Sequence, residues 1–453
     1  MKVIVVGCGK IGKAILESMQ EERHDIVAID NDPQVIEQIT NTFDVMAIYG
    51  SATSTEMLNQ AEVSKTDLFI AVTESDEVNM LSCFLAKRMG AKYTVARIRE
   101  TEYNDDSLQI LKKELDLSMS LNPELLTAQA LYDILKLPSA VNVDNFAGKM
   151  VQLLEIVVHD DSPIVNKTLQ DIRKKSSVPF VACVVQRDDQ VYIPTGTFQL
   201  QVEDKVAFMV KRSDSHKFVK GAGFAQKQGH DVIIMGGSTV ACYLAKLLAS
   251  NGLNVKIIEK DEEKCAVIAE KLPSSTTVIC GDGTNQDLLW EEGIRQTSAF
   301  VALTGNDEEN ILMSFYCNSE RVPKVITKVS HQNMISLAEK LGLYTTVCPQ
   351  KFVANTLTRY ARALDNSLAS KVETMYNLMD GKAEALEFAV LSDSAIIGVP
   401  LKDLNLKPNF IIAGIIRGRE TIIPQGSDSI NIGDRVIVVA MGSHLYDLSE
   451  IVR

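Results

Sequence analysis

The chain contains two copies of one long pattern. The segment KVIVVGCGKIG, which includes Gly7, returns as DVIIMGGSTVA, which includes Gly236, 229 positions later (236 − 7). Further along, YGSAT at 49–53 returns as CGDGT at 280–284, at an offset of 231 (280 − 49). Self-similarity at a nearly constant offset means that one architecture occurs twice, so any fold proposed for the first half must also suit the second.

A smaller repeated pattern follows each copy of the large one. DSPIVNKTLQDI at 161–172 resembles DSAIIGVPLKDL at 393–404. Each half therefore holds a larger unit of about 120 residues and a smaller one of about 85, sizes that are usual for independent domains. We predict four domains, with joins where proline, glycine and polar residues gather. The domains are expected at 1–122, 141–224, 230–350 and 369–453, and the joins near 137–145, 221–229 and 365–380.

The larger unit alternates strand and helix patterns. Apolar runs of strand length are separated by segments such as 78–89, where apolar residues recur at helical spacing, and this predicts a parallel sheet with helices on both faces. The smaller unit has short strands, a brief helix at 169–174 and a hairpin at 188–189. The predicted fold class is α/β, with two Rossmann-like parallel-sheet domains, each followed by a small α+β domain. The strands expected in the first large unit are 3–6, 26–29, 46–49, 68–72 and 94–98.

An amphipathic helix is expected at the end of each large unit. The two helices are predicted at 123–137 and 352–364. The face of the first helix opposite its apolar stripe is only weakly polar, so the helix has apolar surface to cover. Two interpretations stay open, namely packing on its own domain or docking on a neighbouring lobe or subunit.

Composition excludes several classes of function. The net charge of −13 makes the surface repel phosphate backbones and anionic lipid headgroups. Apolar runs such as 411–416 are strand-sized, far short of the roughly 20 residues that span a bilayer. Eight cysteines without a CxxC pair and six scattered histidines indicate reduced core residues and no metal site. We therefore expect a cytoplasmic protein that binds no nucleic acid and does not insert into a membrane.

The first glycine loop has the context of a dinucleotide-binding motif, because it follows a strand and opens a helix. Gly7 allows the tight turn, Gly9 lets the backbone approach a pyrophosphate, and Gly12 lets helix and strand pack closely. Asp30 ends the next strand, 18 residues after Gly12 (30 − 12), close to the roughly 20 expected for a ribose-binding acid. Its charge repels a 2′-phosphate, so NAD(H) or adenine nucleotides are favoured over NADP. The alternative is a turn of this shape without a ligand. The candidate loop residues are Gly7, Cys8, Gly9, Lys10, Ile11 and Gly12.

The second glycine loop departs from this motif. A serine stands where the second glycine would be, and its side chain crowds a pyrophosphate, although Glu259 keeps the acidic role. Two interpretations stay open, namely binding of the same or a different nucleotide, and an empty structural copy. The candidate residues are Gly236, Gly237, Ser238, Thr239, Val240 and Glu259.

Residues at the ends of other strands line the same crevice, because ligands of open parallel sheets sit beyond the carboxyl ends of the strands. Arg97 ends the fifth strand and either meets phosphate charge or pairs with Glu100 or another acid. The remaining candidates are Ser51, Ala52, Thr53, Thr73 and Glu74, with Thr304 and Lys328 as second-half counterparts.

Taken together, the duplicated glycine-loop domains, the GSAT and GDGT segments and VARIR at the fifth strand resemble the regulator-of-potassium-conductance (KTN/RCK) family. The resemblance covers essentially the whole chain. It implies binding of NAD(H), with ATP or ADP as further ligands, by the loop and strand-end residues named above. It also implies a ring-like homo-oligomer, a tetramer, which docks on an integral membrane potassium channel subunit of Trk type and so lies peripherally on the inner face of the membrane. Ser51 stands where the family often has Asp, and Ser238 departs from its glycine.

The predicted function is regulatory rather than enzymatic. The resemblance implies a subunit of a Trk-type potassium uptake system that gates a membrane channel partner through ring conformation, with no catalytic residue. The alternative is an NAD-dependent dehydrogenase, which needs a positioned acid or base facing the nicotinamide. The smaller domains offer His159 and His216 without a motif around either.

Overall fold

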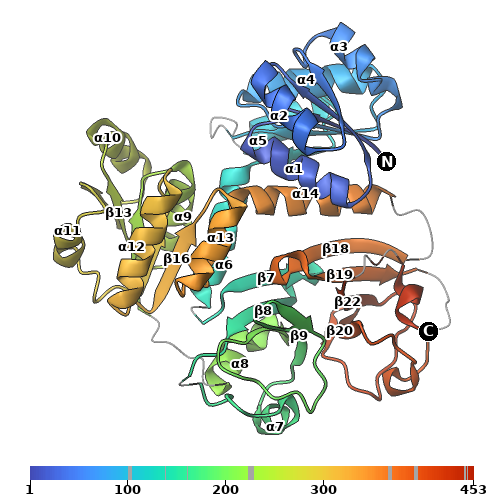
Figure 1. Cartoon of the computed structure of the whole chain (residues 1–453), viewed down its shortest axis with the longest axis vertical. Helices are drawn as coiled ribbons and strands as arrows, with labels where there is room; N and C mark the ends of the chain where they lie inside the picture. Colours follow the sequence, from blue (N-terminus) through green and yellow to red (C-terminus); the bar gives the residue numbers. More distant parts are fainter. Residues whose placement is uncertain are drawn as a thin grey trace. The chain divides into compact units, whose positions relative to one another are not determined.

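The computed structural model describes residues 1–99, 105–137, 139–160, 162–222, 229–365, 370–391, 396–442, 445 and 447–453. Their strands form four sheets, two of six strands and two of five (Figure 1). The chain divides into two compact units, Met1–Ala128 with Cys348–Ala361, and Gln129–Val347 with Arg362–Arg453. Within the described ranges, no helix has both the length and the apolar character needed to cross a membrane.

The first parallel sheet has the strand order β3-β2-β1-β4-β5-β6, the order of dinucleotide-binding folds. Successive strands are added on one side of β1 up to β3 and on its other side from β4 onward, and this switch in strand order opens a crevice at the carboxyl ends of β1 and β4. The five expected strands are confirmed, and β6 is a sixth that the pattern did not indicate. The strands are β1 (Lys2–Val6), β2 (Asp25–Asp30), β3 (Met46–Tyr49), β4 (Leu68–Ala71), β5 (Tyr93–Arg97) and β6 (Met119–Leu121). The helices are α1 (Lys10–Glu21), α2 (Pro33–Thr42), α3 (Thr55–Gln60), α4 (Asp76–Arg88) and α5 (Asp105–Glu114).

The second parallel sheet repeats this order as β14-β13-β12-β15-β16-β17. Its central strands are almost wholly buried, as expected for a sheet covered on both faces. The strands are β12 (Asp231–Met235), β13 (Asn254–Glu259), β14 (Thr276–Cys280), β15 (Ala299–Ala302), β16 (Lys324–Lys328) and β17 (Thr346–Val347). The helices are α9 (Thr239–Ala249), α10 (Glu262–Lys271), α11 (Gln286–Glu291), α12 (Asp307–Ser319) and α13 (Gln332–Lys340).

Each small domain is built on an antiparallel sheet, with orders β10-β9-β11-β8-β7 and β18-β19-β22-β20-β21. The predicted helix is α7, and the predicted hairpin joins β9 to β10 with Asp188 at φ +53°. The strands are β7 (Asn142–Phe146), β8 (Val151–Val157), β9 (Val181–Arg187), β10 (Gln190–Tyr192), β11 (Lys205–Lys211), β18 (Ser370–Leu378), β19 (Ala383–Val390), β20 (Phe410–Arg417), β21 (Glu420–Ile422) and β22 (Arg435–Met441). Two helices belong to the first domain, α7 (Leu169–Lys175) and α8 (Ser215–Gly221).

Two of the expected joins overlap the first strand of a small domain, which the expected domain starts at 141 and 369 include. β7 begins within 137–145 and β18 lies within 365–380. The sequence NVDNF of β7 has only two buried residues, so it lacks an apolar run, and strand pairing with β8 defines it instead. Most of the third join, at 221–229, lies outside the described residues.

The two small domains share one apolar core. Phe146 of β7 and Tyr376 of β18 lie edge to face with ring centroids 4.9 Å apart, and the Tyr376 hydroxyl donates to the carbonyl of Asn145 at 2.8 Å. The backbone amide of Ala147 donates to the buried carboxylate of Glu387 at 2.9 Å. The buried members of this core include Val151, Leu153, Val184, Met209, Leu378, Ala385, Ala413, Ile416, Ile437 and Val439. The pair of small sheets is therefore one packed unit.

The connector helices are α6 (Pro123–Lys136) and α14 (Pro349–Asp365), both at their predicted places. Residues 348–361 belong to the compact unit of the first parallel sheet, where the hydroxyls of Ser18 and Thr358 lie 2.6 Å apart. In the other unit, the buried Nζ of Lys324 on β16 donates to the carbonyl of Ala140, just after α6, at 2.6 Å. For α14, packing on the neighbouring lobe is thus the correct interpretation.

Candidate nucleotide-binding sites

The first glycine loop is held in a turn that only small residues permit. Gly7 has φ +84°, and a Cβ on it would lie 2.7 Å from the backbone nitrogen of Thr73. A Cβ on Gly12 would lie 2.0 Å from the carbonyl oxygen of Gly7, so α1 packs directly against the turn. The Gly7 amide donates to the carbonyl of Ile29 at 2.9 Å, which fixes the loop to β2. Two of the three motif glycines therefore serve local geometry.

The N-terminus of α1 is open. Gly9 occupies the N-cap position, no side chain caps the helix, and a Cβ on Gly9 would meet no atom within 4 Å. The first backbone amides of a helix lack intrahelical partners and carry a partial positive charge. Lys10 begins the helix and is exposed, while Ile11 is half-buried. An uncapped helix start facing open space fits a phosphate or pyrophosphate group.

Asp30 lies beside this open helix start. Its Oδ2 accepts a 2.6 Å hydrogen bond from the amide of Cys8, and its Oδ1 accepts one of 2.9 Å from the amide of Asp32. The side chain is half-exposed, so its carboxylate keeps acceptor capacity for ribose hydroxyls. Burial raises the pKa of the Cys8 thiol to about 12, so Cys8 is a neutral core residue beneath the loop.

The end of β4 is organised by an asparagine that the motif analysis did not single out. Asn79 on α4 is fully buried, and its Oδ1 accepts from the amide and the hydroxyl of Thr73 at 2.8 and 2.7 Å. Its Nδ2 donates to the carbonyl of Arg97 at 3.0 Å. Asn79 thus joins the ends of β4 and β5 on the crevice side. A signal existed, since the repeat pairs DEVN at 76–79 with DEEN at 307–310.

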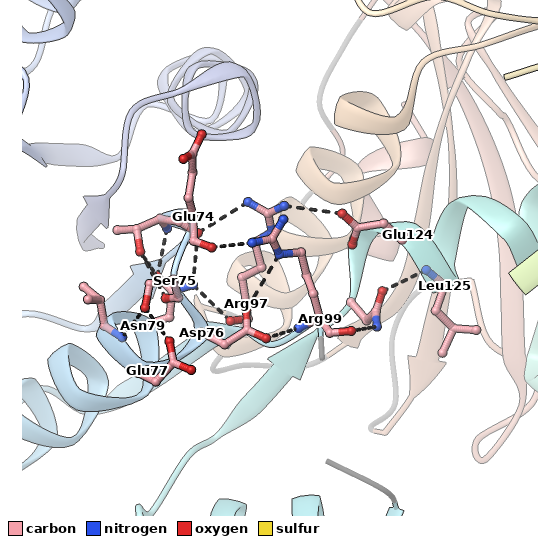
Figure 2. A network of polar contacts seen from close by, with 12 residues as sticks. Glu74, Ser75, Asp76, Glu77, Asn79, Arg97, Arg99, Glu124 and Leu125 are labelled. Atoms are coloured by element: carbon pink, nitrogen blue, oxygen red, sulfur yellow. Dashed lines mark hydrogen bonds and ion pairs between the residues drawn. The ribbon is translucent and has the colours of Figure 1, made fainter. Parts of the chain in front are cut away.

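Arg97 and Arg99 lie between the end of β4 and α6 (Figure 2). Arg97 donates from Nη1 to the carbonyl of Thr73 and pairs through Nη2 with Glu124, both at 3.4 Å. Burial lowers the pKa of the Arg97 guanidinium, and Glu124 acts in the opposite direction. Arg99 donates to the carbonyl of Glu74. The ion pair of Arg97 with Glu124 is the second of the two interpretations, pairing with an acid, and Glu100 lies outside the described residues.

The segment after β3 contributes mainly hydroxyl groups. Ser51 is exposed and its Oγ lies 2.9 Å from Oγ1 of Thr53, whereas the side chain of Ala52 is buried. Hydroxyls can donate to a ribose or phosphate without adding charge. Ser51 and Thr53 are therefore the members of this predicted group whose side chains a ligand could reach.

The second glycine loop has the same turn but a closed helix start. Gly236 has φ +97°, and a Cβ on it would lie 2.9 Å from the nitrogen of Thr304. Ser238 is the N-cap of α9, and its hydroxyl accepts from the amide of Ala241 at 3.3 Å. A side chain thus satisfies a helix amide that is left open in the first loop. Thr239 is exposed and Val240 is buried beneath the loop.

The acidic residue of the second loop is fully engaged by the chain itself. Glu259 accepts from the amide of Gly237 at 2.8 Å and from Nζ of Lys264 at 2.7 Å. Its other oxygen accepts from the amides of Lys260 and Asp261 at 2.9 and 3.1 Å. Burial acts to raise the pKa of Glu259, but the Lys264 ammonium and the amides outweigh it and the pKa is lowered. The carboxylate is 8% exposed, against a half-exposed Asp30.

The strand ends of the second half copy those of the first. Asn310 accepts from the amide and the hydroxyl of Thr304 at 3.0 and 2.8 Å and donates to the carbonyl of Lys328 at 3.0 Å. Nζ of Lys328 donates to the carbonyl of Thr304 at 2.9 Å, as Arg97 does to Thr73. The predicted residues of each half are thus brought together by one conserved bonding scheme. His159 and His216 are both exposed in the first small domain, outside these schemes.

Fold and site together define a tandem protein with two Rossmann-like domains, each followed by a small antiparallel domain, in which one glycine loop is open and the other is closed. The chain belongs to the family of the Trk system potassium uptake protein TrkA. The TrkA-N domain matches residues 3–117 and 232–349, and the TrkA-C domain matches 153–221 and 385–453. The Trk system potassium uptake protein TrkA homolog of Archaeoglobus fulgidus is 30% identical over 453 residues, which is 100% of both chains. The predicted family is confirmed.

Solved structures with the same fold include the RCK domain of a protein named GsuK and a structure of the GsuK channel. The GsuK RCK domain superposes with a TM-score of 0.63 at 15% identity, over 97% of this chain and 92% of that one. A structure described as GsuK channel bound to NAD superposes with a TM-score of 0.61 at 15% identity, over 97% of this chain and 77% of that one. These likenesses confirm the predicted fold class, including its tandem arrangement.

Proposed function

We propose that this chain is the cytoplasmic regulatory subunit of a Trk-type potassium uptake system, which binds NAD(H) or an adenine nucleotide and gates an integral membrane channel subunit. The observation that carries the proposal is the uncapped N-terminus of α1 beside the half-exposed Asp30. The name of the full-length relative and the nucleotide in the related channel structure support it.

The first loop is the proposed dinucleotide site. The amides at the start of α1 would hold the pyrophosphate, and Asp30 would accept hydrogen bonds from the adenosine ribose. Thr73 and Glu74 at the end of β4, with Ser51 and Thr53 after β3, would line the remainder of the crevice. Arg97 is partly neutralised by Glu124, so its proposed role is to hold the crevice in shape and to add positive charge near the phosphates.

The second loop is the weaker site. Ser238 caps α9 and Lys264 neutralises Glu259, so a nucleotide there would have to displace two interactions that the chain already makes. We propose that the second loop has a structural role and stays empty while a nucleotide occupies the first loop.

The proposed mechanism is a population shift. A nucleotide in the first crevice contacts α1, the end of β2 and the end of β4, and it stabilises the lobe arrangement in which these elements fit it best. A ligand can shift such an equilibrium only by its difference in affinity for the two arrangements. The channel subunit would bind one arrangement of the ring more tightly than the other. The nucleotide should therefore change the affinity of the ring for the channel by the same factor as the channel changes its affinity for the nucleotide.

The proposed ring is a homo-oligomer, a tetramer. Leu312 and Phe315 on α12 are 63% and 46% exposed, and Leu81 on α4, 231 positions before Leu312 (312 − 81), is 49% exposed. Exposed apolar residues repeated at equivalent places in both halves suit contact with a second copy of the chain. Light scattering on the wild type and on Leu312→Glu with Phe315→Glu tests this. A smaller mass for the variant is expected, and an unchanged mass would contradict the assignment.

The rival class is an NAD-dependent dehydrogenase. Hydride transfer needs an acid or base positioned at the nicotinamide, and the histidines considered for that role are exposed in the first small domain. The residues that do line the first crevice bind and position a ligand. Absence of substrate turnover under saturating NAD(H) is therefore expected.

Calorimetric titration with NAD, NADH, ATP and ADP is the deciding experiment. Saturable binding by the wild type, abolished in Asp30→Ala and retained in Glu259→Ala, is the expected result. No binding by the wild type would refute the nucleotide-sensing role. Potassium flux into liposomes that contain the channel subunit, measured with and without the nucleotide, tests the gating step separately.

A further inference from the structure

Two cysteines of the second Rossmann-like domain lie side by side. Cys280 is the last residue of β14 and is the direct strand partner of Glu259 on β13. Cys265 on α10 packs on the same place, because its thiol donates to the carbonyl of Glu259 at 3.2 Å. The two cysteines thus lie against the same residue, Glu259, one from the helix and one from the strand. The pair therefore joins a helix to the neighbouring strand.

The two thiols differ in access. All eight cysteines lie in described parts of the chain and all are free; among them Cys280 is exposed, Cys242 is intermediate and the others are buried. Burial, together with the neighbouring Cys280 thiol, raises the pKa of the Cys265 thiol to about 11. An oxidant from solution thus reaches Cys280 first, while Cys265 stays a protonated, buried thiol beside the strand partner of Cys280.

We propose that Cys265 and Cys280 are a redox-active dithiol that hydrogen peroxide or an alkyl hydroperoxide converts to an intrachain disulfide. In the first step the sulfur of Cys280 takes one oxygen from hydrogen peroxide, which yields a sulfenic acid and one water. In the second step the sulfur of Cys265 attacks that of Cys280, the S–S bond forms and a second water leaves. The two thiols lose two electrons and two protons, and an external dithiol reverses the change.

The disulfide would alter the surroundings of Glu259. Formation of the S–S bond removes the S–H proton that Cys265 donates to the carbonyl of Glu259. It also ties the first turn of α10 to β14, and this turn carries Lys264, the cation that pairs with the Glu259 carboxylate. Oxidation should therefore change the hydrogen bonds and the ion pair of Glu259 at the second glycine loop. This inference does not depend on nucleotide binding or on the channel.

The first half has no equivalent pair. Ile36 and Tyr49 stand at the corresponding positions, 229 (265 − 36) and 231 (280 − 49) residues earlier. The reaction is thus confined to the second Rossmann-like domain, and the other half serves as an internal control.

The test uses the full-length protein. It is treated with hydrogen peroxide, alkylated with N-ethylmaleimide under denaturing conditions, digested and examined by mass spectrometry without reduction. A peptide pair linked through Cys265 and Cys280 is expected, with Cys8, Cys83 and Cys183 alkylated, and dithiothreitol should abolish the link. Sulfinic acid on Cys280 with Cys265 fully alkylated, or a link between Cys280 residues of two chains, would overturn the proposal.

Two single variants and a control variant show whether the disulfide requires both Cys265 and Cys280. Cys265→Ser should convert the peroxide product at Cys280 to sulfinic acid, whereas Cys280→Ser should leave Cys265 reduced. Cys242→Ser, on α9, should still give the linked peptides. Circular dichroism of each variant before treatment verifies that it is folded. An equal yield of linked peptides from Cys265→Ser, through another cysteine, would also contradict the pairing.

Discussion

Nζ of Lys264 lies 2.7 Å from Oε2 of Glu259, so the second half of the chain supplies its own cation to the acid of its glycine loop. The first half has Val35 at the equivalent position, 229 residues earlier (264 − 229), and Asp30 pairs with no lysine among the contacts described. This difference adds to that between Gly9 and the capping Ser238 in distinguishing the open site from the closed one.

Replacing Lys264 should open the second loop. Lys264→Val removes the ammonium from Glu259 and restores the residue type of the first half. We expect nucleotide binding at the second loop to become measurable by calorimetry in an Asp30→Ala background, which isolates that loop. Because the Lys264 side chain is half-exposed, the loss of stability should stay below about 1 kcal/mol. Val35→Lys is the converse variant, and it should weaken binding at the first loop. Unchanged binding in both variants would show that this pair does not control access.

Gly9→Ser should separate helix capping from ligand binding. A serine here copies Ser238, whose hydroxyl accepts from a helix amide. The new cap should leave the free energy of unfolding unchanged or raise it by a few tenths (about 0.3) of a kcal/mol, because serine is only slightly better than glycine at an N-cap. Affinity for NAD(H) should fall at least tenfold, since the side chain enters the space above α1. Thermal unfolding and calorimetry on the same sample check both effects, with Ser238→Gly as the matched control. Reduced stability together with reduced affinity would point to a simple folding defect.

Asn79→Ala should damage the first crevice, and Asn310→Ala should damage only the second. Each asparagine is buried and bonds both a strand-end threonine and the carbonyl at the end of the next strand. Loss of the side chain leaves buried backbone groups unpaired, at about 2–4 kcal/mol in each case. Both variants should therefore unfold at lower temperature by similar amounts. Binding of NAD(H) at the first loop should weaken in Asn79→Ala and persist in Asn310→Ala. Equal binding by the two variants would remove the proposed role of Asn79.

Lys324 should make stability depend on pH. Burial lowers the pKa of its ammonium from 10.5 to about 7. Below pH 7 the amine is protonated in both folded and unfolded chains, so the cost of burying its charge is fully present. Between pH 7 and 10.5 the unfolded chain binds the extra proton, and stability from this group rises with pH by about 1.4 kcal/mol per unit.

The variant Lys324→Met isolates this contribution. The difference in melting temperature, variant minus wild type, should be largest at pH 6 to 7. It should become smaller at pH 8 and smaller again at pH 9. Part of the gain is offset because the carbonyl of Ala140 and the hydroxyl of Thr345 lose their donor. A difference that stays constant from pH 6 to 9 would mean that Lys324 does not titrate in this range.

Most of the fold was predicted from the repeat and its glycine loops. Strand runs such as 68–72 are apolar throughout, because a parallel sheet buries both faces, and they are visible without any neighbour. The polar strand β7 is defined by pairing with β8, and β18 by pairing with β19, so neither stood out. The exchange of α14 onto the first parallel domain depends on a contact between residues 340 positions apart (358 − 18), which no local pattern encodes.

The candidate site was predictable where residue type dictates geometry. Gly7, Gly12 and Asp30 have the contacts that their motif requires. Lys264 was not predicted, because a lysine on a helix has no distinguishing spacing, and for Asn79 the one signal was its repetition as Asn310. Their roles follow from what the fold places opposite them, the Thr73 hydroxyl in one case and the Glu259 carboxylate in the other.

The apolar core shared by the two small domains bears on how the halves can diverge. When a two-fold pair forms from identical chains, every substitution appears on both sides of the interface at once. Here both sides belong to one polypeptide, so each side can change alone while the core between β8 and β19 is kept. The two halves can therefore carry different residues, such as a glycine in one loop and a serine in the other, or a dithiol in one half alone. Two identical subunits could not differ in this way.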